Sequence, residues 1–133
     1  MKKDITIPEV KNVHVAVVNE SLGEGESGWN VYLINDLNEI IEGVMVTSSG
    51  YSDELKKVKT SVLRHMVGNI PAKTAAKIEP ISETVFEINN EYWVTFFSGN
   101  KLMEKKFVFG PHTITKVLEE ELPVMNCKGV IIW

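Results

Sequence analysis

Residues near the middle of the chain carry side chains that suit a charged ligand. Arg64 is the only arginine in the sequence and stands directly before His65, with Tyr51 and several lysines shortly upstream. A guanidinium presents a planar fork of N–H donors that can grip a phosphate or a carboxylate with two hydrogen bonds. We therefore expect a ligand-binding site formed by Arg64, His65 and Tyr51. The ordinary alternative is a solvated strand face on which Arg64 pairs with a nearby glutamate.

Nucleophilic catalysis would have one thiol and several hydroxyls to use. Cys127 is the sole cysteine, and its neighbours Asn126 and Lys128 could lower the pKa of the thiol modestly. No serine stands in a G-x-S-x-G elbow, the turn that exposes the nucleophile of many hydrolases. The sequence therefore predicts no catalytic residue and an idle Cys127. A small enzyme with a site near Arg64 and His65 is the alternative.

Metal binding requires ligands at short, regular spacing. The three histidines stand at positions 14, 65 and 112, roughly fifty residues apart, and the single cysteine has no partner. Neither acidic run, over residues 20–26 or 119–121, follows the spaced pattern of a calcium loop. We predict no metal site and no cofactor.

Glycines at 23, 25 and 28 fit the spacing G-x-G-x-x-G of a dinucleotide-binding turn. The residues between them include Glu24 and Glu26, which would repel a pyrophosphate. The chain then continues from Trp29 as a predicted strand, whereas the motif requires a helix. These glycines instead indicate a long exposed hairpin connection over residues 19–28.

Aromatic residues concentrate in one predicted hairpin, over residues 92–109. Because side chains alternate between the two faces of a strand, these rings cannot all enter one core. Either both faces of the hairpin are covered, or one face presents an apolar patch to a partner. Trp133 raises the same question on the apolar segment 130–133. We expect an interface at Trp93, Phe97 and Trp133, either in a homodimer or with a protein that docks by strand addition or face packing.

Hydrophobic residues recur mostly with period two, which indicates strands. The predicted strands cover residues 13–18, 29–34, 40–47, 58–63, 75–78, 92–97, 102–109 and 130–133. Pro80 should end the strand that begins at residue 75. Gly110-Pro111 should end the strand over residues 102–109. Residues 82–88 could form one or two helical turns with Ser82 as N-cap. Residues 114–122 carry the one convincing helical period. The β-branched residues in this segment and the run of carboxylates at its C-terminal end disfavour a helix.

Several short strands with turns between them predict an all-β protein, an antiparallel β-sandwich of immunoglobulin-like architecture with at most one short helix. Residues 1–133 are expected to form one domain, since a length of 133 residues suits a single core. A small β-barrel is the alternative. A parallel α/β sheet is disfavoured because it would need crossover helices between strands.

Composition limits the partners. The chain has 14 basic and 18 acidic residues, a net charge of −4, and a pI near 5.4. Nucleic acid and anionic membranes attract basic surfaces, so we expect neither as a partner. The N-terminus does not lead into the apolar segment of a signal peptide, and one cysteine allows no intrachain disulfide. We expect a cytoplasmic protein.

Five stretches resemble a family of small uncharacterised bacterial proteins, some of whose members are labelled as phenylalanyl-tRNA synthetase subunits. They are residues 31–35, 46–51, 59–65, 89–94 and 105–109. The similarity spans most of the chain. Synthetase nucleotide motifs are missing, and Arg64 alone cannot supply the arginines of a class II site. The resemblance therefore implies a family without a function, and we predict a cytosolic module that binds a protein partner or itself through an apolar sheet face or an edge strand.

Overall fold

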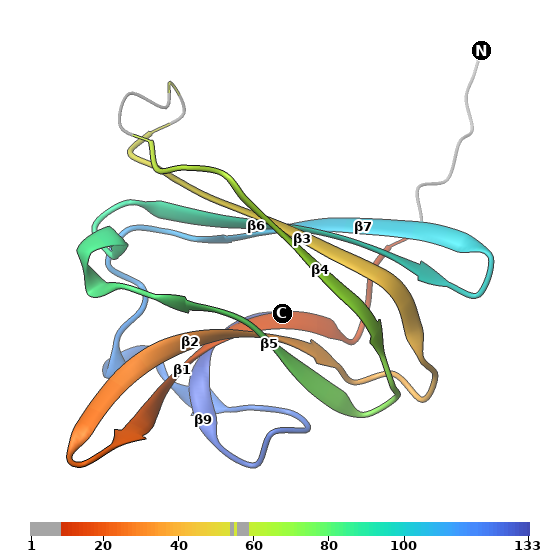
Figure 1. The fold of residues 1–133 in the computed structure, drawn as a ribbon, viewed down its shortest axis with the longest axis horizontal. Coiled ribbons are helices and arrows are strands. Elements are labelled where there is room, and N and C mark those ends of the chain that lie inside the picture. Colours follow the sequence, from red (N-terminus) through yellow and green to blue (C-terminus); the bar gives the residue numbers. More distant parts are fainter. Residues whose placement is uncertain (1–8, 54, 56–58) are drawn as a thin grey trace.

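The chain folds into two antiparallel sheets that pack face to face (Figure 1). The computed structural model describes residues 9–53, 55 and 59–133. The strands are β1 (Val13–Gly23), β2 (Glu26–Asn35), β3 (Ile41–Tyr51), β4 (Leu63–Ile70), β5 (Thr74–Ile81), β6 (Asn89–Ser98), β7 (Lys101–Phe109), β8 (Glu120–Glu121) and β9 (Lys128–Ile132). One sheet has the order β5-β2-β1-β9-β8 and the other β4-β3-β6-β7.

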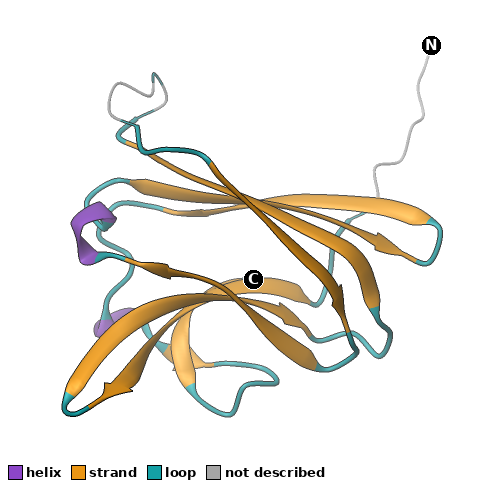
Figure 2. Ribbon diagram, viewed as in Figure 1, coloured by secondary structure: helices purple, strands orange, loops and turns teal. Residues whose placement is uncertain are grey.

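This architecture confirms the predicted all-β sandwich. The two sheets remain separate layers and do not close into the barrel that was the alternative (Figure 2). The helical content of the described residues is two 3-10 turns, η1 (Glu83–Val85) and η2 (Lys116–Leu118), drawn in purple. Within these residues no helix has the length and hydropathy that a membrane span requires.

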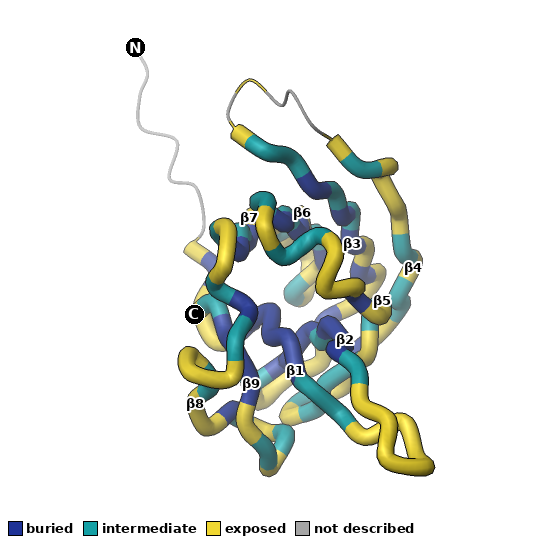
Figure 3. The backbone as a smooth tube through the Cα atoms, turned by 90° about the vertical axis from the view of Figure 1, so that its left-hand side faces the viewer, coloured by how far each residue is buried: buried dark blue, intermediate teal, exposed yellow. Residues whose placement is uncertain are grey.

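The core lies between the sheets and follows from the alternation of apolar residues. Val13, Val15 and Val17 of β1 belong to the same buried cluster as Phe107 and Phe109 of β7. Figure 3 shows buried segments in strands of both sheets. Burying one such side chain stabilises the fold by about 1.5–3 kcal/mol. The strong period-two pattern in the sequence is therefore the pattern of this shared core.

The first hairpin is tighter than the sequence suggested. Strands β1 and β2 extend into the glycine-rich segment and leave Glu24 and Gly25 as the turn. Both turn residues have positive φ, 50° and 80°, as a type I′ turn requires to match the twist of the strands. The expected long loop over residues 19–28 was wrong, because a glycine at the second turn position allows the strands to pair almost to the tip.

Pro80 does not end its strand, contrary to expectation. Strand β5 runs on to Ile81, and Pro80 pairs with Asn30. This is possible because β5 is the edge strand of its sheet, so the missing N–H of proline interrupts no ladder on the outer side. A bulge leaves Ile78 without a cross-strand partner, since Lys77 pairs with Tyr32 and Glu79 with Val31.

Two further segments differ from prediction. The strand expected over residues 58–63 starts at Leu63 and continues to Ile70, while Val58 lies outside the described residues. The helical period over residues 114–122 yields the three-residue η2 followed by the short β8. Ser82 does cap η1, because its Oγ accepts a hydrogen bond from Thr84 N at 3.2 Å.

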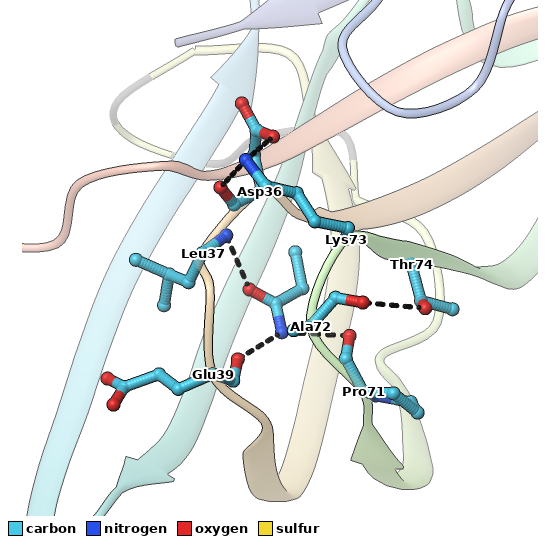
Figure 4. A network of polar contacts seen from close by, with 8 residues as sticks. Asp36, Leu37, Glu39, Pro71, Ala72, Lys73 and Thr74 are labelled. Atoms are coloured by element: carbon cyan, nitrogen blue, oxygen red, sulfur yellow. Dashed lines mark hydrogen bonds and ion pairs between the residues drawn. The ribbon is translucent and has the colours of Figure 1, made fainter.

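Asn35 ties together two turns that connect the sheets. Figure 4 shows labelled residues of both turns, among them Leu37 and Glu39 of one and Pro71 of the other. This fully buried residue donates from Nδ2 to the carbonyl oxygens of Glu39, Ile70 and Pro71 at 3.0–3.1 Å, and its Oδ1 accepts from Leu37 N at 3.0 Å. The β2–β3 turn and the β4–β5 turn are thus joined through one amide. These four side-chain hydrogen bonds all go to backbone groups, so we assign Asn35 a structural role.

The five-stranded sheet is covered on its outer face as well. Ala16, Val18, Ile34 and Ile131 point away from the main core and pack against Leu122, with Met125 and Cys127 alongside. Leu122 itself is buried. The segment that leads from η2 to β9 therefore forms a second small core on this side of the molecule.

Candidate functional site

A pocket lies at one open edge of the sandwich, where β3 and β6 of one sheet approach β5 of the other. Its volume is about 280 Å³. The wall combines hydroxyl and amide groups with short apolar side chains, and η1 closes one side. Its lining includes Ser48, Ser49, Gly50, Thr60, Ser61, Leu63, Glu79, Pro80, Ile81, Ser82, Val85, Asn90 and Tyr92.

Glu79 is the centre of the polar groups in this pocket. Its Oε1 accepts hydrogen bonds from Ser48 Oγ at 3.0 Å and from His65 Nε2 at 2.6 Å. Its Oε2 accepts one from the hydroxyl of Tyr92 at 3.2 Å. Only 13% of the Glu79 side chain is exposed. Strands β3, β4 and β6 thus each send one donor to a carboxylate on β5.

The backbone explains why these four side chains converge. Ser48 pairs with Tyr92 across β3 and β6, so both lie on the inner face of the four-stranded sheet. His65 takes the same face of β4, in register with Val46. The bulge at Ile78 shifts the alternation of β5 by one residue, so that both Ala76 and Glu79 face the other sheet.

The electrostatics of the pocket follow from its burial. Burial and the nearby Glu79 carboxylate raise the pKa of the Tyr92 phenol above its ordinary value. Tyr92 therefore stays protonated at neutral pH and can act as the donor to Glu79. Because a carboxylate oxygen only accepts, the Nε2 atom of His65 must carry its proton.

The three residues predicted to bind a ligand do not come together. Arg64 pairs with Thr47 on the outer face of the four-stranded sheet, whereas His65, its neighbour on the strand, faces Glu79 inside. Tyr51 is on the outer face too, and its hydroxyl donates to Glu91 Oε1 at 3.1 Å. It lies four residues from Thr47 along β3, or about 13 Å at the usual rise of a strand.

The residues expected at an interface divide between the two sheets. Trp93 and Phe97 lie on the outer face of the four-stranded sheet, where 42% and 45% of each residue is exposed. Trp133 lies on the other sheet, beside His14, with the ring centres 4.9 Å apart in an edge-to-face contact. The main-chain oxygen of Trp133 accepts hydrogen bonds from His14 Nδ1 and Lys105 Nζ.

Trp93 and Phe97 belong to a larger exposed group that the sequence did not reveal. Three more apolar side chains lie on the same face. Leu102 pairs with Phe97, and Met45 pairs with Thr95 on one side and with Met66 on the other. We call Met45, Met66, Trp93, Phe97 and Leu102 the apolar patch. Met66 is the most exposed of them, at 76%.

Cys127 is poorly placed for nucleophilic catalysis. Burial raises the pKa of its thiol, and the carboxylates of Glu20, Glu121 and Glu119 raise it further. The expected slight lowering of this pKa by Asn126 and Lys128 is therefore wrong, because burial and the surrounding carboxylates favour the protonated thiol. Within the described residues, no group of three histidine, cysteine or acidic side chains could hold a metal ion.

Glu79, the organising residue of the pocket, is not among the site residues predicted from the sequence. Its position depends on the bulge at Ile78, which no pattern of residue types announces. Ser48 and Tyr92 gave a weak signal, since each is a polar or amphipathic residue at an inward position of an otherwise apolar strand. Comparison with protein-family models, curated proteins and solved structures gives no match to this chain.

Proposed function

We propose that this chain is a non-catalytic interaction module that self-associates through the outer face of the β4-β3-β6-β7 sheet. One observation carries the proposal: five exposed apolar side chains form the apolar patch on this face, and no described segment covers them. Contiguous apolar surface of this kind marks protein interaction sites more often than scattered single residues do. The other sheet, by contrast, has its outer apolar residues covered by the segment around Leu122.

Charge complementarity supports a second copy of the chain as the occupant. Along β7, Lys106 pairs with Trp93 and Glu104 pairs with Thr95, so opposite charges stand on successive rows of the same face. A twofold axis that crosses the strands between these rows would place Lys106 opposite the partner's Glu104, and the same pair would occur twice. Isologous interfaces require this self-complementarity.

The same axis matches one pair of apolar residues on β7. Leu102 lies one row beyond Glu104, and Val108 lies one row beyond Lys106 on β7. The twofold operation would bring Leu102 against the partner's Val108, while the Trp93 row would meet the row of Met45 and Thr95. Sheets packed in this way keep their strands roughly aligned, as in sandwich cores.

Sedimentation equilibrium across a micromolar concentration range tests the proposal. We expect reversible dimerisation, and we expect Phe97→Ser to weaken it by about tenfold or more, because a buried aromatic anchor dominates such interfaces. Leu22→Ser is the control, since Leu22 is at least as exposed as Phe97 but lies near the tip of the first hairpin. A strict monomer at high micromolar concentration, or equal effects of the two changes, would overturn self-association.

The remaining expectations belong to the same proposal. We propose an immunoglobulin-like arrangement of the sandwich, a cytoplasmic location, and a relation to the bacterial family that the sequence resembles. The single cysteine and the acidic composition support the location. No nucleic acid, membrane or cofactor takes part in the proposed function.

A further inference from the structure

The pocket around Glu79 is separate from the apolar patch and carries chemistry of its own. It lies on the inner side of the four-stranded sheet, whereas the apolar patch lies on the outer side. Its volume of about 280 Å³ is near the lower limit for small-molecule sites. A ligand of this pocket must therefore be small.

The carboxylate of Glu79 retains one place for a further donor. A carboxylate has about four acceptor positions, two on each oxygen. On Glu79, Oε1 is occupied by Ser48 and His65, whereas Oε2 accepts a hydrogen bond from Tyr92 alone among the described residues. A ligand that donates to Oε2 would occupy the fourth acceptor position of the carboxylate.

The charge of the pocket selects the sign of the ligand. Glu79 is the only acidic or basic residue among the described residues that line the cavity. His65 touches it from β4, and 27% of that side chain is exposed. A carboxylate in a partly buried site attracts a cation and repels an anion, and the low local dielectric strengthens both effects. His65 reduces this attraction when it is protonated, because its Nε2 lies 2.6 Å from Glu79 Oε1.

The rest of the lining selects the shape of the ligand. Leu63, Ile81 and Val85 supply apolar wall next to the polar groups. Such a surface suits a short hydrocarbon stem. A bare metal ion fits it poorly, since no three metal-ligating side chains meet within the part of the chain that the structure describes.

We propose that this pocket binds a small primary ammonium compound with a short apolar stem. The ammonium group donates to Glu79 Oε2, and the stem lies against Leu63, Ile81 and Val85. Ser48, His65 and Tyr92 hold the carboxylate in place and contribute through it.

The first experiment titrates the full-length chain with butylammonium and follows backbone amide resonances by NMR. We expect saturable shifts at Ser49 and Gly50 with a Kd in the millimolar range, as suits so small a ligand. Butyrate and 1-butanol share the stem but not the positive charge, and each should bind at least about tenfold more weakly. Equal shifts with butyrate, or shifts that do not saturate, would overturn the proposal.

Variants then test the role of the carboxylate. Glu79→Gln keeps the size of the side chain and should weaken butylammonium binding by about tenfold or more. Glu87→Gln changes the net charge equally at an exposed site outside the lining, and should leave the affinity unchanged. If both variants bind as the parent does, Glu79 does not hold the ligand and the proposal is wrong.

A second variant covers the case in which Glu79→Gln does not fold. Leu63 lines the pocket and is half exposed, so Leu63→Lys should be tolerated and should supply a tethered ammonium group of its own. We expect this variant to exclude butylammonium, and unchanged binding would contradict the proposal. Phe97→Ser should bind butylammonium normally, which separates this site from self-association.

Discussion

The two sheets of this sandwich differ in how far other residues cover their outer faces. On the five-stranded sheet, Ala16, Val18 and Ile34 are covered by the segment that contains Leu122. On the four-stranded sheet, the apolar patch stays exposed and only single polar contacts border it, such as that from Trp93 Nε1 to Glu104 Oε2 at 3.2 Å. The chain can therefore cover an outer face with its own residues, and among the described residues it does so on the five-stranded sheet only.

This difference separates two uses of apolar residues. Buried apolar area contributes to the stability of the monomer, whereas exposed apolar area contributes only when a partner covers it. Changes on the covered face should therefore alter unfolding, and changes on the apolar patch should alter association. Four predictions test this division, ordered by expected size.

The largest effect is expected at Leu122. Leu122→Ala removes the side chain that fills the second small core, and we expect the free energy of unfolding to fall by about 3 kcal/mol, from lost burial and the cavity left behind. Urea denaturation followed by circular dichroism measures this. Leu102→Ala is the matched change on the apolar patch and should alter unfolding by less than about 0.5 kcal/mol, while it weakens dimerisation. Similar losses for both variants would remove the distinction between the faces.

Gly129 should be the next most sensitive position. A Cβ atom there would lie 2.9 Å from Val17 O and 2.9 Å from Leu122 Cδ1. Because a backbone oxygen cannot easily move aside, we expect Gly129→Ala to cost about 2 kcal/mol in thermal or urea unfolding. Gly28→Ala is the comparison, since its Cβ would meet only the exposed side chain of Leu22. A neutral Gly129→Ala would show that the covering segment is loosely packed.

The two tyrosines that donate to glutamates offer a smaller contrast between the inside and the outside of the four-stranded sheet. Tyr92→Phe removes the donor to Glu79 in the buried pocket and should lower the free energy of unfolding by about 1.5 kcal/mol. Tyr51→Phe removes the hydrogen bond to Glu91 on the outer face, where water can replace it, and should cost less than half as much. Denaturation curves of the two variants measure both changes in the free energy of unfolding. Equal losses would mean that water reaches the pocket as readily as it reaches the surface.

The pH dependence at His14 is the smallest expected effect. Burial lowers the pKa of this imidazole from its ordinary value of 6.5, so the unfolded chain takes up the proton first as the pH falls. Stability should be unaffected by His14 above about pH 6.5. It should decrease as the pH falls below that value, until the folded protein is protonated as well.

His14→Gln should remove this part of the slope from a plot of unfolding free energy against pH. His112→Gln, a change at an exposed site, should leave the slope as it is in the parent. Since His14 and Trp133 share the outer side of the five-stranded sheet, the result would show whether acid loosens that side first. Identical slopes in both variants would contradict the assignment to His14.

Much of the fold could be read from residue types because the rule behind it is local. Side chains alternate along a strand, so Val13, Val15 and Val17 had to share one face. Arg64 and His65 lie beyond the strand predicted over residues 58–63, so their alternation was not predicted; in β4 they point to opposite faces of the sheet. Gly110-Pro111 ended β7 at Phe109 as expected, because proline cannot continue a ladder.

Other features depend on which strands become neighbours, and that is not a local property. Pro80 could stay within β5 only because β5 became an edge strand, and Glu79 reached the pocket only because a bulge at Ile78 shifted its phase. The cover over the five-stranded sheet likewise required Leu122 to pack against β1 and β9. Sequence alone thus determined most of the strands, the inward face of strands such as β1, and the sandwich, since each follows from short-range periodicity. Only the tertiary structure decided which outer face was covered and where the buried carboxylate lies, because both depend on contacts between residues far apart in the chain.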